Sequence, residues 1–121
     1  MPDARAGLGR SGEAVARRHL EAKGYAILAE RFRTRAGEID LVVEDGRTIV
    51  FVEVKTRRSR SAGAPEESVG PLKQRRLVRM ASVFLTMRGL HGRDCRFDVV
   101  AVEERDDGPI EIRHLRDAFR A

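Results

Sequence analysis

The sequence predicts a single-domain α/β protein with elements in the order helix, three strands, helix and strand, followed by a short edge strand. Two segments, 12–23 and 71–89, place apolar residues at helical spacing. Four segments are short and rich in Val, Ile, Leu and Phe, which is typical of strands, namely 25–33, 37–43, 49–56 and 95–103. The chain has 121 residues, which is enough for one hydrophobic core.

The first helix is expected from about Gly12 to Lys23, with Ser11 as its N-cap and Gly24 ending it. Residues 1–8 are expected to form a loose tail. Helical spacing puts Glu13 on a partly apolar stripe with Ala16, Leu20 and Lys23. Two explanations of Glu13 stay open, which are a functional carboxylate and an N-terminal acidic residue favoured by the helix dipole.

The second and third strands form a hairpin, because Asp45-Gly46 lies between two apolar runs and suits a two-residue type I′ turn. That turn predicts four cross-strand pairs: Glu44–Arg47, Val42–Ile49, Asp40–Phe51 and Glu38–Glu53. Since side chains alternate between faces, one face carries Glu38, Asp40, Phe51, Glu53 and Lys55. The other face is expected to be the core face, with Ile39, Leu41, Val43, Val50, Val52 and Val54.

Acidic and basic side chains inside such apolar strands are costly to bury unless they are paired or bind a metal. The predicted register makes Asp40 and Glu53 diagonal neighbours, about 7–8 Å apart at the backbone, so their carboxylates can share one cation. The alternative is that Glu38 and Glu53 simply belong to the solvated face of an ordinary antiparallel hairpin. Lys55 favours the first interpretation, since only three of the 24 basic residues are lysines and a lysine suits work on a water molecule.

Residues 58–70 are rich in Ser, Ala, Gly and Glu and are expected to form a loop that contacts substrate. The second helix follows from Pro71 to Gly89, with an apolar stripe on one side and a basic side on the other. After the strand 95–103, a turn leads to a short edge strand at 110–115.

Several stretches resemble the YraN family, a family of small bacterial proteins within the PD-(D/E)XK nuclease superfamily. The YraN family is similar to archaeal Holliday junction resolvases. The similarity covers about residues 7–103. Its motifs are Gly12-Glu13-x-x-Ala16, Gly24-Tyr25, Gly37-Glu38-Ile39-Asp40-Leu41-Val42, Val50-Phe51-Val52-Glu53-Val54-Lys55-Thr56-Arg57 and Arg96-Phe97-Asp98-Val99-Val100. The resemblance implies a restriction-endonuclease-like αβββαβ core, with a mixed central sheet flanked by helices.

The resemblance further implies an endonuclease that hydrolyses DNA phosphodiester bonds with Mg²⁺ or Mn²⁺. Asp40 and Glu53 would be metal ligands, and the backbone carbonyl of Val54 would be a third. Lys55 would orient or deprotonate the attacking water. Glu13 would complete the acidic cluster and serve a second metal if there is one.

The net charge of +5 and the pI near 10.3 favour an anionic partner, and DNA is the expected one. Eight residues are candidates for contacts with its phosphates: Arg57, Arg58, Arg60, Lys73, Gln74, Arg75, Arg76 and Arg79. Branched junctions, flaps, single strands and RNA offer the same phosphates, so the sequence leaves the substrate form open. Cleavage of a junction would require a homodimer with paired sites.

The lone Cys95 rules out an internal disulfide and a zinc site built on a cysteine cluster. Neither a signal-peptide apolar core nor an apolar run of membrane-spanning length occurs, so a soluble cytoplasmic protein without a membrane partner is expected. The sequence has no Gly-rich phosphate loop, and no small-molecule cofactor is expected. Two other functions stay open: a nucleic-acid-binding module that does not cleave, and an interaction factor in a DNA-repair or recombination assembly.

Overall fold

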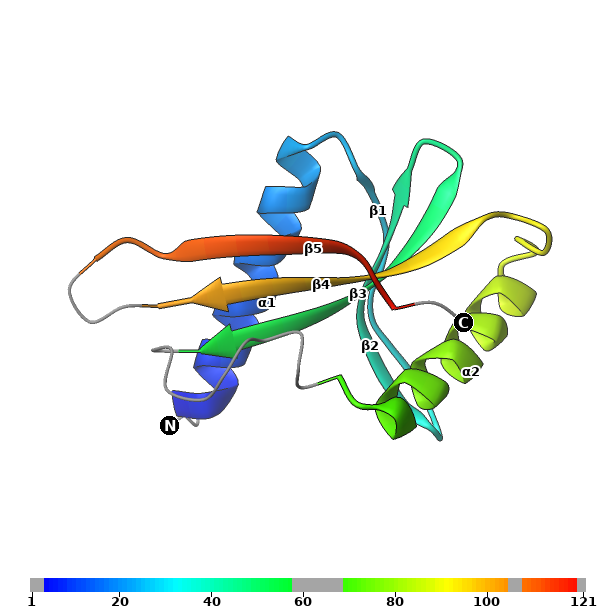
Figure 1. Ribbon diagram of the computed structural model, residues 1–121, viewed down its shortest axis with the longest axis horizontal. Helices are drawn as coiled ribbons and strands as arrows, with labels where there is room; N and C mark the ends of the chain where they lie inside the picture. The colour runs from blue at the N-terminus through cyan, green and yellow to red at the C-terminus, as the bar shows by residue number, and fades with distance from the viewer. Residues whose placement is uncertain (1–3, 58–68, 105–107, 120–121) are drawn as a thin grey trace.

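The computed structural model describes residues 4–57, 69–104 and 108–119, with side chains from residue 12 onward (Figure 1). Its helices and strands follow the predicted order, with a fifth strand at the end. They are α1 (Ala4–Ala22), β1 (Ala26–Thr34), β2 (Gly37–Asp45), β3 (Thr48–Arg57), α2 (Pro71–Met87), β4 (Cys95–Glu103) and β5 (Glu111–Phe119).

The strands form one mixed sheet in the spatial order β1-β2-β3-β4-β5. β3 and β4 are parallel, whereas the other neighbouring strands are antiparallel. Parallel neighbours need a crossover connection, and α2 lies in the segment that joins β3 to β4. The predicted α/β class with a mixed sheet and flanking helices is therefore confirmed.

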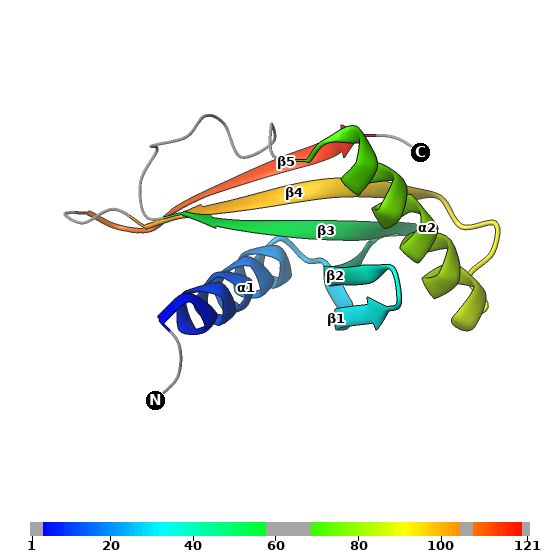
Figure 2. The same ribbon diagram turned by 90° about the horizontal axis from the view of Figure 1, so that it is seen from below.

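Both faces of the sheet are covered, one by each helix. Along β3, Ile49 and Phe51 pack with Leu77 and Phe84 of α2. Val50 and Val52, which alternate with them, pack in a second cluster with Ala16 and Leu20 of α1. Figures 1 and 2 show the two helices on opposite sides of a strongly twisted sheet. In the part of the chain that the structure describes, neither helix is long and apolar enough to cross a membrane.

The prediction of a single core face was therefore wrong. The face that carries Phe51 and Glu53 is also buried, because α2 covers it. Ile39 belongs to this α2 cluster rather than to the cluster under α1. A strand covered on both sides carries consecutive apolar residues, as Ile49 to Val52 do, so strict alternation is not a guide to its buried face.

Two element boundaries differ from the prediction by four residues or more. α1 begins at Ala4, so residues 4–8 belong to the helix and not to a loose tail. The three glycines in the early part of α1 argued against a helix, but propensity is a weak prior that neighbouring alanine, leucine and arginine residues can outweigh. β5 extends to Phe119, beyond the predicted Leu115, because its far end pairs with β4 at Phe97. The edge position of β5 is confirmed.

The hairpin register is also different. Asp45 pairs with Thr48 and Val42 with Phe51, so the turn residues are Gly46 and Arg47. Gly46 has a φ of +62°, whereas Asp45 stays in the strand, where the guanidinium of Arg96 binds its carboxylate at 2.9 Å. A type I′ turn at Asp45-Gly46 would have required a positive φ at Asp45. The register moves by two residues along β3, an even shift, so the paired side chains from Leu41 to Asp45 and from Thr48 to Val52 keep their predicted faces. Ile39, beyond the last pair, does not.

Candidate active site

The candidate site lies where the pairing of β2 with β3 ends. Regular pairing runs from Asp45 opposite Thr48 to Leu41 opposite Val52. Asp40 and Glu53 are the next residues along the two strands, just beyond the last pair of this register. Here a side chain takes the place of a backbone acceptor: Asp40 Oδ2 accepts the hydrogen bond from the N–H of Val54 at 2.7 Å. The two acidic residues therefore both lie at the point where the hairpin pairing ends.

The environment of Asp40 disfavours its charged form. Burial is the main cause, and the nearby carboxylate of Glu53 is the second; together they raise the pKa of Asp40 to about 7. The hydrogen bond from Val54 opposes this shift, whereas Glu13 and Glu38 add to it. A buried carboxylate among other carboxylates is relieved either by a proton or by a bound cation.

Glu53 is 8% exposed, and one of its oxygens is shared by two lysines. Lys73 Nζ donates a hydrogen bond to Glu53 Oε1 at 2.6 Å, and Lys55 Nζ lies 3.4 Å from the same oxygen. Lys55 comes from β3 itself, two residues after Glu53, whereas Lys73 comes from the first turn of α2. The carboxylate thus has a charge partner from its own strand and another from a helix.

The two lysines differ in their electrostatics. Burial lowers the pKa of Lys55, and the neighbouring Lys73 lowers it further against the attraction of Glu53. Burial also opposes the charged form of Lys73, but hydrogen bonds with Glu53 and Lys55 and the charges of Glu53 and Asp40 together outweigh it and raise the pKa of Lys73. Lys55 is therefore the lysine that gives up a proton more readily, which suits a group that handles a water molecule.

Glu13 reaches this region from the middle of α1, where its charge helps to raise the pKa of Asp40. The helix-dipole explanation of Glu13 is wrong, because α1 begins at Ala4 and Glu13 is far from its first turn. Gly12 lets the helix approach this closely. A Cβ on Gly12 would lie 2.1 Å from the hydroxyl oxygen of Thr56, the residue that follows Lys55.

Arg31 is the partner of Glu13 and was missed by the sequence analysis. Its Nε donates a hydrogen bond to Glu13 Oε2 at 2.7 Å. The backbone of Arg31 is left-handed, with a φ of +52°, which is uncommon for a residue with a side chain. One arginine in an arginine-rich strand gives no sign of such a conformation, so the sequence held no signal for this pair.

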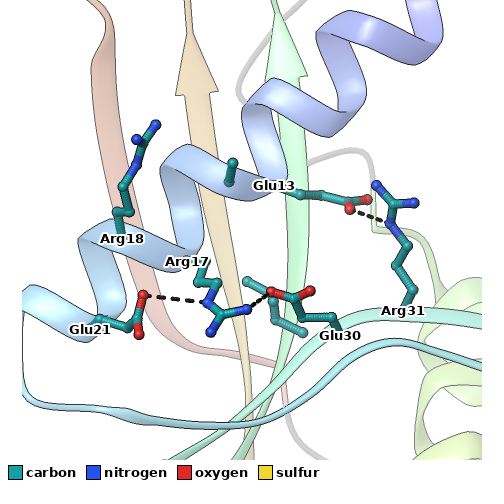
Figure 3. Close-up of a pocket in the computed structure, with 8 residues that line it drawn as sticks. Glu13, Arg17, Arg18, Glu21, Glu30 and Arg31 are labelled. Carbon is teal, nitrogen blue, oxygen red and sulfur yellow. Dashed lines mark hydrogen bonds and ion pairs between the residues drawn. The ribbon is translucent and has the colours of Figure 1, made fainter.

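A hollow of about 340 Å³ borders the site on the Glu13 side, between α1 and β1. Figure 3 shows Glu13 and Arg31 pointing toward each other at one end, and Arg17 lying between Glu21 and Glu30. Acidic and basic side chains alternate around it, and Arg17 and Arg31 are both paired. This hollow therefore does not favour an anion such as phosphate.

The predicted phosphate-binding residues are placed in different ways. Arg75, Arg76 and Arg79 are exposed on α2. The side chain of Gln74 donates a hydrogen bond to the carbonyl of Val69 at 2.8 Å, at the entrance of the helix. Arg57 ends β3, where its carbonyl accepts a hydrogen bond from the N–H of Glu104 at 2.7 Å. Arg58, Arg60 and the predicted loop up to residue 68 lie outside the described residues.

The donor set of the site suits a hard divalent cation, because Asp40 and Glu53 offer carboxylate oxygens. Within the described part of the chain, no three Asp, Glu, His or Cys side chains stand together as a ready metal site. Glu53 is turned to Lys73, and Glu13 is turned to Arg31. A cation bound at Glu53 would therefore compete with Lys73, and one bound at Glu13 would compete with Arg31.

The motif Arg96–Val100 builds a second polar cluster, on β4. Asp98 is 1% exposed and accepts hydrogen bonds from Arg96 Nε at 3.1 Å, His114 Nε2 at 2.7 Å and the N–H of Asp117 at 2.9 Å. Arg96 also donates hydrogen bonds to the hydroxyl of Tyr25 and to the carboxylate of Asp45, each at 2.9 Å. These bonds tie β5 and the hairpin to β4, so the cluster is structural.

Comparisons with known proteins agree on one family. The model of the Uncharacterised protein family UPF0102 matches residues 12–102. A UPF0102 protein of Symbiobacterium thermophilum is 50% identical over 114 residues, which are 94% of this chain and 97% of that protein. A UPF0102 protein of Geotalea uraniireducens is 47% identical over 112 residues, covering 93% and 88% of the two chains. One from Moorella thermoacetica is 50% identical over 112 residues, covering 92% and 93%.

Proposed function

This chain belongs to the UPF0102 family, which is the YraN family that its motifs resemble. From the geometry of its site, we propose that it is a metal-dependent endonuclease that hydrolyses DNA phosphodiester bonds. The observation that carries the proposal is the placement of Asp40. Its partly buried carboxylate lies near Glu53 and accepts a hydrogen bond from the N–H of Val54, and Lys55 lies 3.4 Å from Glu53. Two carboxylates can hold a cation for metal-assisted hydrolysis, and a lysine of lowered pKa can position the attacking water and take up its proton.

Each residue has a distinct role in this proposal. Asp40 and Glu53 would hold Mg²⁺ or Mn²⁺, with the carbonyl of Val54 as a further oxygen ligand. A bound cation supplies charge neutralisation at the scissile phosphate and makes a bound water more acidic. Lys55 positions the attacking water and steadies the charge that develops on the phosphate. Glu13, bonded to Arg31, supplies a carboxylate for a second cation.

The basic surface supports a nucleic-acid substrate. The chain carries a net charge of +5, and Arg75, Arg76 and Arg79 extend from α2, the helix whose first turn places Lys73 in the site. Phosphates bound along this helix would lead the DNA backbone toward Asp40 and Glu53. Each phosphate contact made in this way contributes about −0.9 to the log–log slope of affinity against salt.

A second candidate function is a nucleic-acid-binding module that does not cleave. One observation favours it: Lys73 and Lys55 already neutralise Glu53, so Glu53 does not need a metal to balance its charge. In this case the basic surface would bind nucleic acid at an affinity that is independent of divalent cations.

The test is cleavage of labelled duplex, flap, single-stranded and four-way-junction DNA with Mg²⁺, Mn²⁺ or EDTA. Three near-isosteric variants are compared with wild type: Asp40→Asn, Glu53→Gln and Lys55→Gln. Asp94→Asn, at an exposed position, is the matched control. Cleavage that requires a metal, persists in the control and is lost in the three variants is expected. The preferred DNA gives the substrate form, and sedimentation of the same protein shows whether a homodimer acts on a junction.

Cleavage in EDTA, or cleavage that survives in all three variants, would contradict the proposal and point to a contaminating nuclease. Salt-sensitive binding without cleavage, equal in wild type and variants, would favour the binding module.

A further inference from the structure

Lys73 forms an ion pair with Glu53, one of the two carboxylates that would bind the metal ion in the proposed function. Its ammonium donates to Glu53 Oε1 at 2.6 Å, closer than Lys55 at 3.4 Å. The side chain of Glu53 is 10% exposed, so this pair is well screened from water on the Glu53 side. A charge pair in this setting is stronger than one on an open surface.

The local structure of α2 gives Lys73 no reason to be in its first turn. A cation near a helix N-terminus opposes the helix dipole. The first turn of α2 contains no acidic residue, and the N-cap Gly70 provides no side-chain hydrogen bond. The favourable partner of Lys73 is therefore Glu53, on the neighbouring strand β3.

A metal ion and the Lys73 ammonium compete for the same oxygen. Mg²⁺ binds carboxylate oxygens at about 2.0–2.1 Å. An ammonium that donates to that oxygen would be held a few ångströms from the ion, where like charges repel strongly. Of the two lysines, Lys73 can move away from Glu53 more easily. Its side chain is 38% exposed against 21% for Lys55, and its flexible side chain extends from α2, whereas Lys55 is on the same strand as Glu53.

We propose that Lys73 is a tethered counter-ion, which neutralises Glu53 in the metal-free protein and is displaced when a divalent cation binds between Asp40 and Glu53. This inference rests on the proposed function, because it concerns the same site. The displaced ammonium remains near the site, where a phosphate of the substrate is its natural new partner. Lys73 thus sets the metal affinity and links it to the binding of DNA.

The test measures binding of Mn²⁺ alone by isothermal titration calorimetry, together with the melting temperature in EDTA and in Mn²⁺. Lys73→Met removes the ammonium, and Lys73→Gln keeps a hydrogen-bond donor without the charge. Arg47→Met, at an exposed turn position, is the control for the loss of one positive charge. Asp40→Asn tests whether binding occurs at this site.

Both Lys73 variants are expected to bind Mn²⁺ about tenfold more tightly than wild type, while the control is unchanged. Their melting temperature is expected to be lower in EDTA and to rise further on addition of Mn²⁺, because only the cation then neutralises Glu53. Binding that Asp40→Asn abolishes but that Lys73 variants do not strengthen would overturn this inference alone. Absence of Mn²⁺ binding in wild type and in both Lys73 variants would overturn the proposed function as well.

Discussion

The carboxylate of Asp40 on β2 accepts a hydrogen bond from the backbone N–H of Val54 on β3 at 2.7 Å. Within a strand, the N–H and the C=O of one residue point to the same edge. The carbonyl of Val54 therefore faces the side of β3 on which Asp40 lies. Glu53 and Lys55 flank Val54 in the chain, so one short piece of strand combines the oxygen donors of the site with its lysine.

The first prediction concerns stability and pH. Because the pKa of Asp40 is raised to about 7, the folded protein holds a proton that the unfolded chain releases near the ordinary value of 3.8. This contribution to stability is present below about pH 4 and is lost as pH rises toward 7. Asp40→Asn removes it and the buried charge together. In EDTA at pH 8 the variant should be more stable than wild type by on the order of 1–2 kcal/mol.

Urea unfolding in EDTA between pH 4 and 8 measures this difference. Asp94→Asn, which changes an exposed aspartate, should keep the wild-type pH dependence. A constant difference between Asp40→Asn and wild type across this range would show that Asp40 titrates near its ordinary pKa.

The second prediction separates the charge of Lys55 from its ability to give up a proton. Lys55→Arg retains a positive charge, but arginine stays protonated at every relevant pH. Burial lowers the pKa of Lys55, so the native residue is suited to proton transfer. Both Lys55→Arg and Lys55→Gln should reduce the single-turnover cleavage rate by about 10²-fold or more. The affinity for Mn²⁺ should not fall in either variant.

Calorimetry and single-turnover kinetics on the same preparations measure the two quantities. If Lys55→Arg cleaves at the wild-type rate, the role of Lys55 is electrostatic and the proton-transfer role is wrong.

The strand and helix order was predictable because it depends on local patterns. Apolar spacing identified α1, α2 and four strands, and the match of α2 is close, since it begins at the predicted Pro71. The turn was harder to place, because Asp45-Gly46 and Gly46-Arg47 both contain the required glycine. The choice between them depends on Arg96, which lies 51 positions from Asp45 and holds it in the strand.

The acidic pair and Lys55 could be predicted because they lie within one hairpin. The charge partners that now occupy the site could not be assigned in the same way. Lys73 meets Glu53 across the connection from β3 to α2, and Arg31 meets Glu13 through a left-handed backbone. Such contacts depend on how the helices pack on the sheet, and this packing cannot be predicted from the spacing of residues in the sequence.

The third prediction tests the approach of α1 to β3. In Gly12→Ala, the new Cβ would lie 2.1 Å from Thr56 Oγ1 and 3.2 Å from Thr56 Cβ, so the helix or the strand must move. We expect a loss of about 1–3 kcal/mol in the free energy of unfolding. The shift should also displace Glu13 and weaken cleavage more than it weakens DNA binding. Gly70→Ala is the control, since its Cβ would meet no atom within 4 Å and its φ is −74°.

Thermal or urea unfolding measures the stability, and Gly12→Ala/Thr56→Ala tests the cause. Removal of the Thr56 hydroxyl and methyl leaves only the contact with its Cβ, so part of the stability should return. Equal stability of the single and double variants would show that the close contact with Thr56 is not the source of the loss.

The fourth prediction concerns Asp98, whose role is structural. Asp98 Oδ1 accepts the N–H of Asp117, which has a φ of +54° at the irregular part of β5. Burial works to raise the pKa of Asp98, but hydrogen bonds from His114 and Arg96 outweigh it, and the pKa lies below its usual value. Asp98→Asn keeps the shape of the side chain but removes the charge that Arg96 faces. It should cost about 3 kcal/mol of folding free energy at neutral pH.

Because the pKa of Asp98 is lowered, its contribution to stability is present above the ordinary value of 3.8 and is lost as pH falls through the folded value. The difference between wild type and Asp98→Asn should therefore be constant at pH 5–8 and should shrink below about pH 4. Hydrogen exchange should locate the loss, with faster exchange in β5 and unchanged exchange around Asp40. A uniform increase of exchange across the whole sheet would instead make Asp98 part of the global core, and the separate role assigned to its cluster would be wrong.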